Sequence, residues 1–153
     1  MFKKILVAAD GSSRAEKASS YAIGLAKSCG AELNVVSVVD IGSPRSAMEI
    51  DPDFTEELKD SIDVGKLEDE RKKIENQIVD HVNKMASTEG VSASGSVRVG
   101  HPSEEILKQA QEAGCDLIVM GSHGRRGLSA AVMGSVSTNV IHAGAFPVLV
   151  VPE

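Results

Sequence analysis

The segment KILVAADGS, residues 4–12, decides the fold of this chain. Its apolar run is nearly continuous instead of alternating, which is typical of a strand covered on both faces of a parallel sheet. Directly after it, SRAE at residues 13–16 has the spacing of a capping box. Alanines then recur at helical spacing as far as Gly30, a typical residue after a helix end. A buried strand followed at once by a helix predicts a βα unit.

The same alternation of short apolar runs and longer amphipathic segments continues along the chain. Further strands are predicted at 33–39, 92–99, 116–120 and 147–151, and further helices at about 56–88, from 102 to Gly114, and at about 134–143. Right-handed crossovers then give a single doubly wound, Rossmann-like α/β domain over residues 1–153. It holds a five-stranded parallel sheet with helices on both faces, and the third strand, being the weakest, is expected at an edge.

Two segments between the second and third strands differ in character. Residues 41–55 contain glycine, prolines and scattered acids without periodicity, so we expect a surface insertion. In the long helix that follows, the inner face is predicted from four apolar residues: Leu67, Ile74, Ile78 and Met85. The charged residues of that helix are expected on the solvated face, where Glu68 and Lys72 form an i,i+4 pair.

Composition bounds the classes of function. The 153 residues hold 22 acidic and 16 basic side chains, a net charge of −6, which counts against a nucleic-acid or anionic-membrane partner. No apolar run reaches the length of a membrane span, and the run that ends at Asp10 is shorter than the apolar region of a signal peptide. Cys29 and Cys115 form no pair motif, so we expect reduced thiols in the core and a cytoplasmic location.

The fourth strand is followed by the loop GSHGRRG, residues 121–127, and then by GSVS at residues 134–137. Glycines let backbone N–H groups turn toward an anion, and the start of a helix favours a phosphate. Arg125 and Arg126 add positive charge to an acidic chain. The Walker pattern and the GxGxxG pattern are both missing, so tight-turn geometry without a ligand stays open as an alternative.

Strand ends carry the other unusual residues. Asp10 follows the first strand, Asp40 follows the second, and Gly121 follows the fourth. In open parallel sheets, ligands bind at the carboxyl ends of the strands, near the point where strand order reverses. We therefore expect the ligand site at this edge.

The spacing of Gly121, Gly124, Gly134 and Ser135 matches the signature G-2x-G-9x-G-(S/T). With it go the KILVAADGS segment, DLIVM at 116–120 and FPVLVV at 146–151. In these features the chain resembles the nucleotide-binding branch of the universal stress protein family, over nearly its whole length apart from residues 41–55.

The resemblance implies a bound adenine nucleotide, ATP or AMP, with Mg²⁺ or Mn²⁺ accompanying the phosphates. Ala8 and Asp10 would line the adenosine pocket, and the backbone of Val38 would meet the adenine edge. The phosphates would be held by Gly121, Ser122, His123, Gly124, Arg125, Arg126, Gly127, Gly134, Ser135, Val136 and Ser137. The resemblance also implies a homodimer through the last strand, with the residues Val148, Leu149, Val150 and Val151.

Several residues keep two interpretations. Asp10 is a ligand contact or a cap of the first helix, and His123 touches a phosphate or faces solvent. Met120, at the end of the fourth strand, lines the pocket or fills the core. His81, His101 and His142 share no metal-binding spacing with His123, so no protein metal site is predicted.

The expected function is nucleotide binding with little or no turnover, because no general base is assigned in the sequence. A slow ATPase in the same pocket and a ligand-free dimeric interaction module remain the alternatives. A pyrophosphatase-type hydrolase would need paired glycines after the first strand, where AADGSS stands. A response-regulator receiver would need an aspartate after the third strand, where Gly100 and His101 stand.

Overall fold

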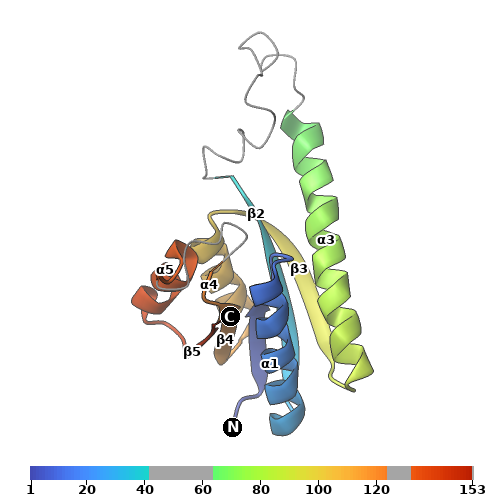
Figure 1. The fold of residues 1–153 in the computed structure, drawn as a ribbon, viewed down its shortest axis with the longest axis vertical. Coiled ribbons are helices and arrows are strands. Elements are labelled where there is room, and N and C mark those ends of the chain that lie inside the picture. Colours follow the sequence, from blue (N-terminus) through green and yellow to red (C-terminus); the bar gives the residue numbers. More distant parts are fainter. Residues whose placement is uncertain (42–63, 124–131, 153) are drawn as a thin grey trace.

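The computed structural model describes residues 1–41, 64–123 and 132–152 (Figure 1). The elements in chain order are β1 (Lys4–Ala8), α1 (Ser13–Cys29), β2 (Glu32–Asp40), α3 (Val64–Thr88), β3 (Ala93–Gly100), α4 (Pro102–Ala113), β4 (Leu117–Gly121), α5 (Ser135–Ala143) and β5 (Val148–Val151). All neighbouring strands pair in parallel, in the order β3-β2-β1-β4-β5. This confirms the predicted α/β fold, and β3 lies at an edge as expected.

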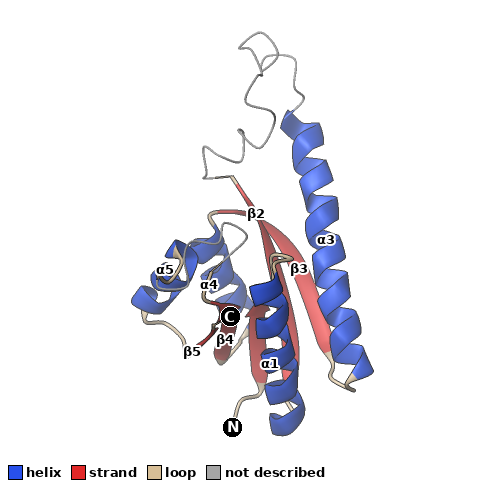
Figure 2. Ribbon diagram, in the orientation of Figure 1, coloured by secondary structure: helices blue, strands red, loops and turns tan. Residues whose placement is uncertain are grey.

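Helices cover both faces of the sheet (Figure 2). α1 packs against β1 and β4, and α3 packs against β2 and β3. On the opposite face α4 lies against β2 and also contacts α5. Successive residues of a strand point to opposite faces, so Ile5 and Val7 belong to the core under α1 and α3, whereas Leu6 belongs to the core under α4 and α5.

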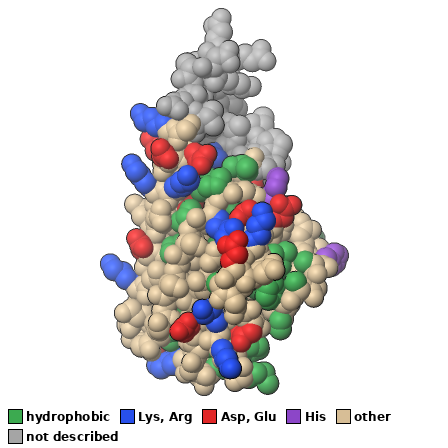
Figure 3. All heavy atoms as spheres, turned by 180° about the vertical axis from the view of Figure 1, so that it is seen from behind, with side chains coloured by type: hydrophobic (Ala, Val, Ile, Leu, Met, Phe, Trp, Pro, Cys, Tyr) green, Lys and Arg blue, Asp and Glu red, His purple; other side chains and the backbone are tan. Residues whose placement is uncertain are grey.

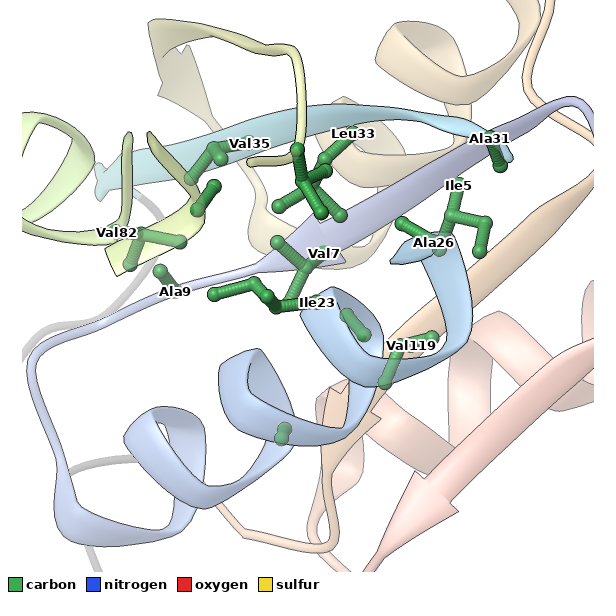
Figure 4. Close-up of a cluster of buried hydrophobic side chains, with 14 of the residues drawn as sticks. Ile5, Val7, Ala9, Ile23, Ala26, Ala31, Leu33, Val35, Val82 and Val119 are labelled. Atoms are coloured by element: carbon green, nitrogen blue, oxygen red, sulfur yellow. The ribbon is translucent and has the colours of Figure 1, made fainter. Parts of the chain in front are cut away.

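The core beneath α1 is aliphatic and tightly spaced (Figure 4). The inner face of α1 is built mostly from small residues, and all of its members are at most 5% exposed: Ala15, Ala18, Ser19, Ala22, Ile23 and Ala26. Small side chains let the helix lie close to the sheet, as the alanine spacing predicts. Gly30 ends the helix in the left-handed conformation at φ 65°, and its N–H bonds the Ala26 carbonyl.

The inner face of α3 agrees with the prediction in part: Ile78 and Met85 are partly buried and pack against the core. Val79, Val82 and Ala86 are buried, together with Glu75, whereas Ile74 is 54% exposed. The carboxylate of Glu75 accepts a hydrogen bond from the Ser37 hydroxyl on β2. The fully buried residues therefore lie about one position further along the helix than predicted. The prediction missed them because a polar residue, Glu75, stands among them.

Further predictions concern an ion pair on α3, the segment before that helix, and the two cysteines. Glu68 and Lys72 form the expected pair, with 3.0 Å between Lys72 Nζ and Glu68 Oε1. The predicted insertion beyond Ile41 and the predicted helix start near residue 56 lie outside the described residues. Cys115 is buried and Cys29 is half-buried, both as free thiols.

The surface carries both signs of charge. On the face shown in Figure 3, basic and acidic side chains lie interspersed. Among the described residues, no helix is both long and apolar enough to cross a membrane.

Candidate functional site

The strand order places two loops beside each other at the carboxyl edge of the sheet. β1 and β4 are adjacent, with Val7 opposite Val119. The chain leaving β1 turns to α1 on one face, and the chain leaving β4 leads toward α5 on the other. Loops that part in this way leave a crevice at the topological switch point, which is where doubly wound sheets bind ligands.

The loop after β1 is held by its own polar side chains. One carboxylate oxygen of Asp10 accepts a hydrogen bond from the Ser12 N–H at 2.9 Å. The hydroxyl of Ser12 in turn accepts from the Ala15 N–H at 3.2 Å, so Ser12 is the N-cap of α1. The capping box predicted at residues 13–16 is therefore wrong by one residue. Asp10 does not cap the helix itself; it fixes the residue that does.

The residues at the end of β4 are bonded to the start of α5. The Gly134 N–H donates to the Ser122 carbonyl at 2.8 Å, and the Ser137 hydroxyl donates to the Gly121 carbonyl at 2.9 Å. The Ser122 N–H donates to the Val151 carbonyl at the end of β5. The two ends of the glycine loop are thus joined, although Gly124, Arg125, Arg126 and Gly127 lie outside the described residues.

The N-terminus of α5 faces this junction without a side-chain cap. Gly134 is the N-cap, and as a glycine it has no side chain with which to cap the first turn. Ser135 is exposed, Val136 half-buried and Ser137 buried. By helix geometry the N–H groups of the first turn have no intrahelical acceptor, and the helix dipole is positive at this end. Such an end is suited to an anion.

Close approach explains two of the signature glycines. A Cβ added at Gly134 would lie 3.2 Å from the Ser122 carbonyl oxygen. A Cβ added at Gly121 would lie 3.3 Å from the backbone of Arg14 in the first turn of α1. Both contacts are tighter than a side chain normally allows, so glycine lets backbone segments meet at the crevice.

His123 is one of the buried polar residues at the site. Its side chain is 7% exposed, and its Nδ1 lies 2.9 Å from the Ser122 hydroxyl. Its Nε2 has no hydrogen-bond partner among the described residues. The interpretation of His123 as a solvent-facing residue is therefore wrong, and the contact with a phosphate remains a prediction.

Three further predicted site residues, Ala8, Val38 and Met120, lie in the strands that end at the crevice. Ala8 and Val38 are half-buried and pack against the core under α4 and α5. Met120 is 4% exposed and belongs to the same core. Val38 lies in β2 opposite Arg98 of β3, next to the strand end at Asp40. Its backbone therefore comes to the same edge of the sheet as Asp10 and Gly121.

Sequence reasoning missed Arg14. The residue is half-buried in the first turn of α1, and its backbone packs directly on Gly121. A signal was available, because the first turn of a helix favours acids over a cation. The contact itself joins residues far apart in the chain and depends on β1 and β4 being neighbours.

A pocket of about 210 Å³ lies elsewhere, between α1 and α3. Its lining includes Gly11, Ser12, Ile78 and Val82, and none of the predicted nucleotide contacts. It shares only the loop after β1 with the crevice. Across the described parts of the chain, no three His, Cys, Asp or Glu residues gather into a group suited to a metal ion.

Comparisons with known proteins agree with this architecture. The sequence model of the Universal stress protein family matches residues 1–152. Universal stress protein YxiE of Bacillus subtilis is 35% identical, over 99% of this chain and 99% of its own length. The solved structure of protein MJ0577, from Methanocaldococcus jannaschii, covers 100% of this chain and 97% of its own, with 35% identity and a TM-score of 0.76.

A more distant structure shares the fold. The universal stress protein from Archaeoglobus fulgidus, solved in complex with dAMP, covers 97% of each chain at 24% identity and a TM-score of 0.65. The family match along almost the whole chain, together with relatives that are 35% identical, fixes the assignment. The chain belongs to the universal stress protein family.

Proposed function

We propose that this protein binds an adenine nucleotide, ATP or AMP, in the crevice between the ends of β1 and β4. The observation that carries the proposal is the N-terminus of α5, whose N-cap Gly134 has no capping side chain and donates its N–H to Ser122 at the topological switch point. The A. fulgidus relative was solved with an adenine nucleotide, dAMP, on the same fold. The nucleotide would serve as a signalling ligand in a stress response.

The residues divide into two halves in this proposal. The loop that begins at Gly121 and the first turn of α5 hold the phosphates through backbone N–H groups, with Mg²⁺ or Mn²⁺ carried by the phosphates. Ala8 and Asp10 border the adenosine, and Met120 supports the pocket from the core. The backbone of Val38 offers one donor and one acceptor to the adenine edge, so base recognition needs no dedicated side chain.

Little turnover is expected in this site. Hydrolysis needs a group that orients or deprotonates water. One oxygen of Asp10 is bonded to the Ser12 N–H, and Nδ1 of His123 is beside the Ser122 hydroxyl. Slow ATP hydrolysis is the second candidate function, because Nε2 of His123 is buried beside the phosphate half without a partner among the described residues.

We further propose that the protein forms a homodimer through β5. This strand is at the edge of the sheet, and its side chains are apolar. Val148, Leu149 and Val150 are half-buried in the single chain. An apolar edge strand needs to be covered, and pairing with a second copy covers it.

Calorimetric titration of nucleotide-stripped protein with ATP, AMP and GTP tests the binding proposal, with released phosphate followed in parallel. We expect ATP or AMP to bind at micromolar concentration, GTP to bind more weakly, and little phosphate to appear. Rapid phosphate release would make the protein an ATPase. If none of the three nucleotides bound, the glycine signature would be turn geometry alone, and the ligand-free interaction module would be the better description.

A further inference from the structure

Ser37 of β2 joins the end of β1 to α3. Its hydroxyl donates to the carbonyl of Ala9, the residue before Asp10, with 2.6 Å between the two oxygens. The same hydroxyl is hydrogen-bonded to the carboxylate of Glu75 on α3. Both Ser37 and Glu75 are buried, so water hardly competes for these contacts. The Ala9 carbonyl is therefore held by a short polar chain that begins on α3.

This carbonyl controls where the backbone carries Asp10. β1 ends at Ala8, so Ala9 lies directly beyond the strand. Its N–H donates to the Val36 carbonyl at 2.9 Å, and its own carbonyl accepts from Ser37. The peptide bond from Ala9 to Asp10 is planar, so fixing the carbonyl oxygen also fixes the plane that contains the nitrogen and Cα of Asp10.

α3 contacts the same loop at a second point. Gly11 has φ +79°, and a Cβ added there would lie 3.1 Å from Cδ1 of Ile78. Ile78 follows Glu75 by three residues, so both lie on one face of the helix. α3 therefore holds the two residues on either side of Asp10, Ala9 through a hydroxyl and Gly11 through an apolar side chain.

Asp10 borders the adenosine in the proposed function, and one of its oxygens accepts from the Ser12 N–H. A site binds more tightly when the groups around its contact residues hold them in place before the ligand arrives. We infer that Ser37 and Glu75 are positioning residues of the nucleotide site, which hold Asp10 against the adenosine and make nucleotide affinity depend on α3. This inference rests on the proposed function.

A double-mutant cycle between Asp10 and Ser37 tests the inference, with ATP affinity measured by calorimetric titration. Ser37→Ala should weaken ATP binding by about 3- to 10-fold, as expected for the loss of one hydrogen bond. Asp10→Ala should weaken it by about 10-fold or more. Because Ser37 acts through Asp10, the double variant should bind ATP as Asp10→Ala does, to within about twofold.

Ser19→Ala is the matched control. Ser19 is also buried, but its hydroxyl donates to the Ala15 carbonyl within α1, at 2.8 Å. This variant should lower the melting temperature about as much as Ser37→Ala and leave ATP affinity unchanged. On α3, Glu75→Gln keeps the size of the side chain and a group that can bond Ser37. It should therefore retain most of the affinity that Glu75→Leu loses.

Additive losses in the cycle, or unchanged ATP affinity in Ser37→Ala, overturn the inference. Wild-type protein that binds neither ATP nor AMP contradicts the proposed function instead. Hydrogen exchange of the Ser12 amide then decides the positioning role without a nucleotide, because this N–H is bonded to Asp10. Faster exchange in Ser37→Ala than in Ser19→Ala supports the hold on Asp10, and equal exchange rejects it.

Discussion

Two polar regions of this molecule differ in the groups from which they are built. On the α4 side of the sheet, the Arg98 guanidinium donates to Glu105 at 2.7 Å, to Glu112 at 2.8 Å and to Gln109 at 3.0 Å. At the carboxyl edge of β1 and β4, the contacts among the described residues are made mostly by backbone groups and hydroxyls, and the N-cap of α5 is a glycine without a capping side chain. The Arg98 cluster is dense in charge yet its charges satisfy one another.

The comparison separates a structural cluster from a candidate site. Hydrogen bonds to Glu112 and Glu105 raise the pKa of Arg98, and the same guanidinium lowers the pKa of both carboxyls. Gln109 extends the cluster to Asn34 on β2, at 2.9 Å. Paired charges tie α4 to β3 and an amide hydrogen bond ties it to β2, whereas the start of α5 presents backbone N–H groups that suit a ligand. Charge density alone is therefore no guide to a candidate site.

The largest expected effect comes from Gly134→Val. The added Cβ would lie 3.2 Å from the Ser122 carbonyl oxygen, and the branch would displace the first turn of α5 from the crevice. We expect ATP binding, measured by calorimetry, to weaken by at least about 30-fold. Gly24→Val is the matched control, because Gly24 is exposed on α1 with open space around it. Unchanged affinity in Gly134→Val would remove the helix end from the site.

Arg98→Met should have the opposite profile, with loss of stability and retention of binding. The Arg98 side chain is 21% exposed, and its removal leaves the Glu105 carboxylate, 12% exposed, without its main partner. We expect the free energy of unfolding in urea to fall by about 1–3 kcal/mol. Lys27→Met, from an exposed pair with Glu89, should cost about 0–1 kcal/mol. A large loss of ATP affinity in Arg98→Met would contradict the separation of the two regions.

A smaller effect is expected in the pH dependence of stability. Arg98 lowers the pKa of Glu105 in the folded state, so the stabilisation is present above the unfolded-state pKa, about 4.3, and is lost as pH falls through the lower folded value. The gap in unfolding free energy between wild type and Glu105→Gln should therefore narrow from pH 7 to pH 3. In an Arg98→Met background the same substitution should leave little pH-dependent gap. A constant gap in both backgrounds would show that Arg98 does not set this titration.

Much of the fold could be predicted because local patterns and tertiary structure agree. The continuous apolar run at residues 4–9 forms a strand buried on both faces, and Gly30 and Gly114 end their helices in the left-handed conformation. Ile106 and Ala110 face inward on α4, as their spacing predicts. The two errors arose where a side chain has more than one possible partner. Ser12 caps α1 in place of Ser13, and Glu75 is buried where an apolar residue was expected.

For the candidate site, the sequence predicted which residues stand at the strand and helix ends; their role in binding stays a prediction. Asp10, Gly121, Gly134 and Ser135 stand at strand and helix ends because buried strands must end in polar or flexible residues at the sheet edge. The burial of His123 and the bonding of the Ser137 hydroxyl to Gly121 could not be predicted. Both depend on how the chain after β4 closes against α5.

The sequence by itself determined the α/β class, the parallel sheet, the position of nearly every element and the glycine signature, because these follow from hydrophobic period and backbone freedom. Tertiary structure alone decided that β1 and β4 are neighbours, that Arg14 meets Gly121, and that Glu75 has a partner in Ser37. The physical reason is the distance along the chain over which each interaction acts. Periodicity and glycine act over a few residues, whereas contacts across the sheet join segments many residues apart, and strand order sets them.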